Sequence, residues 1–186
     1  MALNTSNKVF STRSFRDNFD ATKSINMEYL NLIRTIHVLS GAFWIGEIAV
    51  INFIIIPAAE KMKDQVRSEY FAKVFPAVFK MASILAVLAL ISGVALVFLV
   101  TGDDFSRLFA GRWGLSILVG GIMATALTVF HFFIEHKLAR KLGYIEENDP
   151  NAMADFHIKL KIVPRLGMVV ITVIFLLMLN ASRGIW

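Results

Sequence analysis

The sequence contains no cysteine. This absence excludes disulfide bonds, thiolate zinc sites, iron–sulfur clusters, thioether attachment of haem and a cysteine nucleophile. A metal bound by this chain would therefore take its ligands from histidine, methionine, carboxylate or backbone groups. The sequence also lacks a phosphate-binding glycine motif and a serine nucleophile turn, which argues against a nucleotide-binding protein or a hydrolase. Whether the protein is an enzyme stays open at this stage.

Charged residues are scarce as well. Only 18% of the 186 residues are charged, whereas 56% are apolar, and soluble domains have about 25% charged residues. The net charge is +5, but the basic residues flank apolar stretches and do not form a run with exposed aromatic residues. We therefore expect a lipid bilayer as the surroundings of this chain, and no nucleic-acid partner.

Four apolar stretches are long enough to cross a bilayer. They predict an all-α fold, an integral membrane four-helix bundle with spans at about 30–56, 77–100, 113–134 and 162–179. The stretch at 27–186 thus forms one transmembrane domain. Residues 1–26 read as a polar N-terminal tail, which is either a short helix on the membrane surface or disordered.

The connections between the spans carry turn and charge signals. We expect the first span to stop at Pro57, a short amphipathic interfacial helix at 60–73, and the second span to begin after Pro76. A polar linker at 136–161, with a loop at 147–151, should separate the third and fourth spans. More Lys and Arg residues flank the spans on the side opposite the N-terminal tail. The positive-inside rule then predicts a multi-pass protein of the cell membrane with both termini on the non-cytoplasmic side.

The polar residues of the first span share one face of the helix. At 100° per residue they fall within a sector of about 140°, which must point into the bundle; they are His37, Ser40, Gly41, Trp44, Glu47 and Asn52. Two interpretations remain open. The face either joins helices through small residues and hydrogen bonds, or it lines a functional site.

Glu47 is the most informative of these residues. A carboxyl group near the middle of a span must be protonated, paired with a cation, hydrated or bound to a metal. Its best partner is His131 of the third span, which we place at a similar depth by the helical rise. Glu135 follows His131 by one turn and shares its face, a spacing that allows either metal chelation or a hydrogen bond. For Glu135 and His136 we favour a solvated role at the interface.

A haem site would use different residues. His37 and His131 lie toward opposite sides of the membrane, so one iron cannot bind both. The second axial ligand for His37 should come from the same side of the bundle, where the candidates are Ser116, Met178 and Asn180. Met178 is the one conventional haem ligand among them, although a packing role is commoner for such a residue. Gly93 lies at the same level and should leave room for a flat macrocycle.

The run LIRTIHVLSGAFWIGEIAVINFIIIPAAEK, residues 32–61, resembles the first span of the HemJ-type protoporphyrinogen oxidases and of the related CopD-like membrane domains. The shared residues are His37, Trp44, Gly46 and Pro57. A looser resemblance extends over about residues 30–180, with the same order of spans. It implies a four-helix membrane fold.

The two families imply different ligands. The HemJ-type resemblance makes His37 a haem ligand, but the third span here lacks the lysine that accompanies this histidine in that family. Porphyrin oxidation is therefore not expected. The CopD-like resemblance implies copper uptake or tolerance, with Glu47, His131 and His37 as candidate copper contacts.

Two functions follow from the sequence as expectations. The first is a membrane protein that binds haem b or a copper ion in the polar interior of its bundle, with His37 and Met178 as candidate haem ligands and Glu47 and His131 as candidate metal ligands. The second is a non-catalytic accessory subunit of a larger membrane complex, for example that of a copper enzyme. Such a subunit would assemble with other membrane subunits or with itself.

Overall fold

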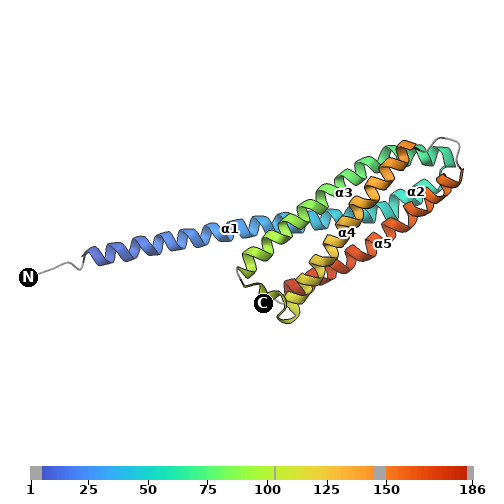
Figure 1. The fold of residues 1–186 in the computed structure, drawn as a ribbon. Helices are drawn as coiled ribbons and strands as arrows, with labels where there is room; N and C mark the ends of the chain where they lie inside the picture. The colour runs from blue at the N-terminus through green and yellow to red at the C-terminus, as the bar shows by residue number, and fades with distance from the viewer. Residues whose placement is uncertain (1–5, 103, 145–149, 184–186) are drawn as a thin grey trace, which may run out of the picture.

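The computed structural model confirms an all-α fold, in which four long helices form a bundle (Figure 1). It describes the backbone of residues 6–102, 104–144 and 150–183, and the side chains of 27–102, 104–134, 136–137 and 161–182. No strand occurs in these backbone ranges. The elements in chain order are α1 (Ser6–Val50), the π-helical turn η1 (Ile51–Ile55), α2 (Ile56–Glu60), α3 (Asp64–Thr101), the 3-10 turn η2 (Phe105–Leu108), α4 (Gly111–Tyr144) and α5 (Pro150–Arg183).

Four helical segments are long and apolar enough to cross a membrane: Met27–Glu60, Asp64–Thr101, Gly111–Ile134 and Lys161–Ser182. Each span predicted from the sequence lies within one of them. Large apolar side chains such as Phe43 and Phe53 remain about two-thirds exposed on the outside of the bundle. In water such a surface would be costly, so these side chains are suited to contact lipid.

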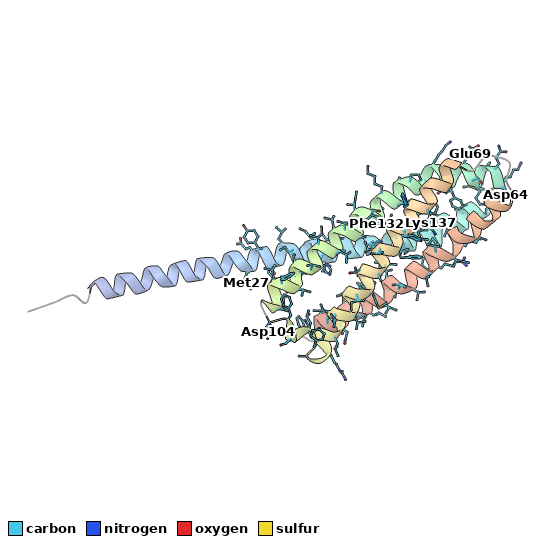
Figure 2. The ribbon with its side chains drawn as sticks, in the orientation of Figure 1. Met27, Asp64, Glu69, Asp104, Phe132 and Lys137 are labelled. Atoms are coloured by element: carbon cyan, nitrogen blue, oxygen red, sulfur yellow. The ribbon has the colours of Figure 1, made fainter. Side chains whose placement is uncertain are left out.

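The helices are arranged so that neighbours in the bundle form a closed ring. α1 packs against α3 and α5, and α4 packs against the same two helices. Met27 and Asp104 lie at one end of the bundle, and Asp64 and Glu69 lie at the other end (Figure 2). We call the end with Met27 side A and the end with Asp64 side B. The N-terminal part of α1 extends well beyond side A (Figure 1).

The core at the centre takes one or two residues from every helix. It consists of Trp44 from α1, Ala82 and Ala86 from α3, Leu127 from α4 and Ile171 from α5. The two alanines let the neighbouring helices approach α3 closely, because they add little volume between the backbones. The four spans are therefore held together at the depth of Trp44.

Pro57 does not end the first span, contrary to expectation. The wider turn η1 precedes it, and in this turn the Ile56 amide donates to the Ile51 carbonyl, five residues earlier. Proline removes a backbone donor, and the change of hydrogen-bond pattern just before it lets the chain stay helical to Glu60. Pro57 sits in the first turn of α2, where a missing donor is tolerated.

Pro76 lies inside α3 and does not interrupt it, so most of the expected interfacial helix at 60–73 is continuous with the helix of the second span. The physical reason is packing. Phe71 and Phe75 are almost fully buried against Ile51, Ile56 and Ala59, which holds the first turns of α3 on the bundle. This burial outweighs the loss of one helical hydrogen bond.

The polar segments are also more helical than expected. The predicted linker at 136–161 is helical to Tyr144 and again from Pro150, while 147–149 of the predicted loop lie outside the described residues. The predicted N-terminal tail is helical from Ser6 and continues into the first span without a break. Its first five residues lie outside the described residues.

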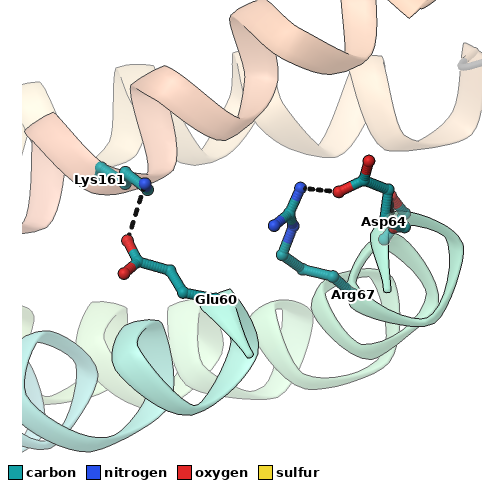
Figure 3. Close-up of polar contacts among 5 residues, drawn as sticks. Glu60, Asp64, Arg67 and Lys161 are labelled. Atoms are coloured by element: carbon teal, nitrogen blue, oxygen red, sulfur yellow. Dashed lines mark hydrogen bonds and ion pairs between the residues drawn. The ribbon is translucent and has the colours of Figure 1, made fainter. Parts of the chain in front are cut away.

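Charged residues form ion pairs at side B of the bundle (Figure 3). Lys161 Nζ of α5 forms an ion pair of 2.8 Å with Glu60 Oε1 at the end of α2. Arg67 pairs with Asp64 in the first turn of α3. The Lys161 and Glu60 side chains are both about half exposed, so this pair contributes little to the stability of the fold. It links α5 to the end of α2.

Candidate functional site

The polar face of the first span points into the bundle, as the sequence predicts. Ser40, Trp44, Glu47 and Asn52 are buried, and His37 is half-buried. Part of this face joins helices: Asn52 Nδ2 donates to the Ile48 carbonyl (2.8 Å) and to the Pro164 carbonyl of α5 (3.0 Å). The rest of the face divides into two places, one around His37 and one around Glu47.

His37 is held against α3. Its Nδ1 lies 2.9 Å from the Ala89 carbonyl oxygen and 3.3 Å from Ser92 Oγ. A carbonyl oxygen can only accept, so the Nδ1 atom carries the proton in this hydrogen bond. The Nε2 atom then holds the lone pair of the neutral imidazole. Histidines that bind metals or haem iron are oriented in this way, with the second ring nitrogen donating to a backbone carbonyl.

The His37 ring packs against Gly93 of α3. A Cβ atom built on Gly93 would be 3.0 Å from His37 Cε1 and 3.3 Å from His37 Nδ1. The space that the sequence suggested for a flat macrocycle is therefore taken by the imidazole itself. Any haem would have to approach His37 from another direction.

The candidates for a second axial ligand lie at the contact between α4 and α5. The Met178 side chain packs over Gly120, where an added Cβ would come within 2.7 Å of Met178 Cε. Asn180 Nδ2 donates to Ser116 Oγ over 2.9 Å. All three candidates thus have a role in joining these two helices, whereas His37 contacts α3.

Glu47 lines a cavity on the side-B half of the bundle. The cavity measures about 70 Å³, and all four spans contribute to its wall. The wall is almost entirely apolar, with Trp44 toward the middle of the membrane and Phe75 and Pro164 toward side B. Glu47 is only 8% exposed, and neither of its carboxyl oxygens has a hydrogen-bond partner among the described residues.

His131 lines the same cavity from α4. Its Nε2 lies 3.1 Å from Ser83 Oγ of α3, and its ring packs against Phe79 at a centroid distance of 6.0 Å. The structure therefore brings Glu47 and His131 to one cavity. His131 contacts α3 at Ser83 and His37 contacts it at Ala89, a separation of six residues or about 9 Å along the helix, so the two histidines stand at different depths.

The described side chains do not assemble a metal centre. No group of three or more His, Asp or Glu residues that could hold a metal ion occurs in the part of the chain that the structure describes. Glu47 and His131 alone supply two groups, fewer than structural or catalytic metal sites use. The expected pairing of His131 with Glu135 cannot be placed here, because the Glu135 side chain lies outside the described residues.

Sequence reasoning missed the hydroxyl groups that hold the histidines. Ser83 and Ser92 contact His131 and His37 respectively. They are the two hydroxyl residues between positions 77 and 100. Serine in an apolar span commonly hydrogen-bonds to a neighbouring helix, so two isolated serines in this span could have indicated contacts with polar side chains of other spans.

Comparisons of the chain with protein-family models, with curated proteins and with solved structures found no match. The resemblance to HemJ-type and CopD-like proteins therefore rests on the residues quoted for it.

Proposed function

We propose that this chain is a multi-pass membrane protein of the HemJ and CopD-like type that binds haem b through His37. The observation that carries the proposal is the hydrogen bond from His37 Nδ1 to the Ala89 carbonyl. It fixes one tautomer and leaves Nε2 as the ligand atom, the arrangement that iron-binding histidines require. When bound, the haem would supply one-electron redox chemistry.

Copper fits the described residues less well than haem. Glu47 and His131 share a cavity, which supports them as a pair, but no third His, Asp or Glu joins them among the described side chains. A copper site would also favour softer or more numerous nitrogen and sulfur ligands. We therefore place haem first.

An accessory subunit is the second candidate. The observation in its favour is the length of α1, which continues from the first span through residues 6–26 and extends beyond the bundle (Figure 1). A helix of this kind offers a surface to another membrane subunit or to a second copy of the chain. In this function His37 would hold the first span against α3, and neither His37 nor Glu47 would bind a metal.

The test of the haem proposal is a visible spectrum of the detergent-purified protein, oxidised and reduced with dithionite, with iron and copper analysis. We expect a Soret band and stoichiometric iron. His37→Ala should abolish the band while the protein still inserts, because the ligand atom is gone. His136→Ala is the matched control, since His136 is exposed near the end of α4, and it should keep the band.

Other outcomes decide between the functions. A Soret band that survives in His37→Ala overturns the ligand assignment. Copper without a Soret band favours the copper site. If neither metal is present after incubation with haem and with copper, the accessory-subunit function replaces the haem proposal.

We also propose that the protein lies in the cell membrane with both termini on the non-cytoplasmic side. Since the chain has no cysteine, single-cysteine variants report topology without background. Ser182→Cys on side A and Lys63→Cys on side B are both at exposed positions. A membrane-impermeant maleimide should label Ser182→Cys in intact cells, and Lys63→Cys only after the membrane is opened. The reverse pattern would invert the topology.

A further inference from the structure

The cavity beside Glu47 contains a polar group that neither the haem proposal nor the packing of the helices uses. The Glu47 side chain is more than nine-tenths buried, it faces the cavity, and both carboxyl oxygens are without a hydrogen-bond partner among the described residues. An unsatisfied buried group of this kind lowers the stability of a fold. Its presence therefore calls for a role.

The surroundings of Glu47 exclude a permanent counter-ion within the described side chains. Of the described residues that line the cavity, His131 is the one titratable group besides Glu47. Lys80 of α3 and Arg165 of α5 are exposed, and Lys161 is paired with Glu60. A carboxylate without a fixed cation in an apolar wall is best stabilised by a proton.

The cavity can also hold the water that proton exchange needs. Its volume of about 70 Å³ leaves room for a few water molecules, because each needs about 10–15 Å³ of space for its centre. Two polar groups on facing helices, Glu47 of α1 and His131 of α4, border this space. Carboxyl and imidazole groups along a wet cavity are the usual parts of proton pathways in membranes.

We propose that Glu47 is a proton-binding site that exchanges its proton with His131 through water in this cavity. In the transfer the Glu47 carboxyl group loses its proton and becomes a carboxylate, and the His131 imidazole gains a proton and becomes an imidazolium. No electron or further reactant takes part. Ser83, which contacts His131 Nε2, is a positioning residue for the imidazole.

The cavity extends from the middle of the membrane toward side B. Trp44 marks its inner end, and Phe75 and Pro164 belong to its wall nearer side B. We therefore place the exchange in the side-B half of the bundle. This site is separate from His37, which contacts α3 at Ala89 and does not belong to the cavity wall. The proposal stands whether or not the chain binds haem.

Labelling with dicyclohexylcarbodiimide tests the proposal, because this apolar reagent modifies protonated carboxyl groups inside membranes. The full chain in detergent or in liposomes would be labelled over a pH series, digested and analysed by mass spectrometry. We expect modification of Glu47 that falls by about tenfold or more between about pH 5 and about pH 10, as the proton is lost. Glu47→Gln should lose the label from this peptide.

Two controls separate the site from an ordinary carboxyl group. Glu69 is exposed near side B, and it should react with a water-soluble carbodiimide in preference to the apolar reagent. His131→Phe keeps an aromatic ring beside Phe79 and should shift the pH at which Glu47 labelling falls. His136→Phe, at an exposed position, should leave the pH dependence unchanged.

The proposal fails if Glu47 is not labelled at any pH while the exposed carboxyl groups react. It also fails if sodium or copper ions at constant pH protect Glu47 from the reagent, because a metal cation would then be the occupant. An unchanged pH dependence in His131→Phe would remove His131 from the exchange. None of these outcomes depends on a Soret band, so they are independent of the haem assignment.

Discussion

Gly114→Ala should destabilise the protein by about 1–3 kcal/mol, because it forces a methyl group into backbone atoms. A Cβ atom on Gly114 would lie 2.2 Å from the Arg107 carbonyl oxygen and 2.6 Å from that of Leu108. Both atoms belong to the 3-10 turn η2, which joins α3 to α4. Unlike a flexible side chain, a turn of backbone cannot move aside without breaking its own hydrogen bonds.

Thermal unfolding in detergent, followed by tryptophan fluorescence, would measure this effect. For a chain of this size the expected loss lowers Tm by about 2–12 °C. Gly121→Ala is the matched control on the same helix, since a Cβ atom there meets nothing within 4 Å. This control should be neutral or slightly stabilising, because alanine favours the helix. Equal melting temperatures for the two variants would contradict the close approach at Gly114.

Glu47→Leu should raise stability by about 1–3 kcal/mol, the opposite of what a core substitution usually does. Leucine has a similar size and matches the apolar wall of the cavity, and it removes two oxygen atoms that have no partner among the described residues. A residue kept at the expense of stability is expected where function requires it. The more stable variant should therefore lose the proton-binding site.

Asn52→Leu provides the contrast for this prediction. Asn52 lies little more than one turn from Glu47, but its amide group joins the first span to α5 through the Pro164 carbonyl. Its loss should lower stability by about 1 kcal/mol. Both variants would be compared with the wild type by the same unfolding measurement. If Glu47→Leu melts below the wild type, Glu47 has a stabilising partner, which contradicts the prediction that its carboxyl group is unsatisfied.

The sequence was sufficient to predict the four spans and to predict which face of the first span points into the bundle. Long apolar stretches follow directly from the thickness of a bilayer, and the burial of Ser40, Trp44 and Glu47 follows from 100° per residue. These features depend on local composition and periodicity. They do not depend on how the helices pack.

The ends of the helices and the details of the site were not predictable in this way. Pro57 and Pro76 remain inside helices because of a π-helical turn and because Phe71 and Phe75 are buried. The hydrogen bond from His37 Nδ1 to the Ala89 carbonyl, and the one between Ser83 and His131, depend on the rotation of α3 relative to its neighbours. Such relations join residues about 50 positions apart, and local patterns do not contain them.

The unbroken helix from Ser6 to Val50 has a mechanical consequence. At 1.5 Å per residue it is about 68 Å long, roughly twice the apolar thickness of a bilayer. Since the helix is continuous from residues 6–26 into the bundle, a protein that binds residues 6–26 and rotates them about the helix axis would exert torque on the face that carries His37 and Glu47. Adding one residue to the helix near Met27 would rotate the outer part relative to this face by about 100°.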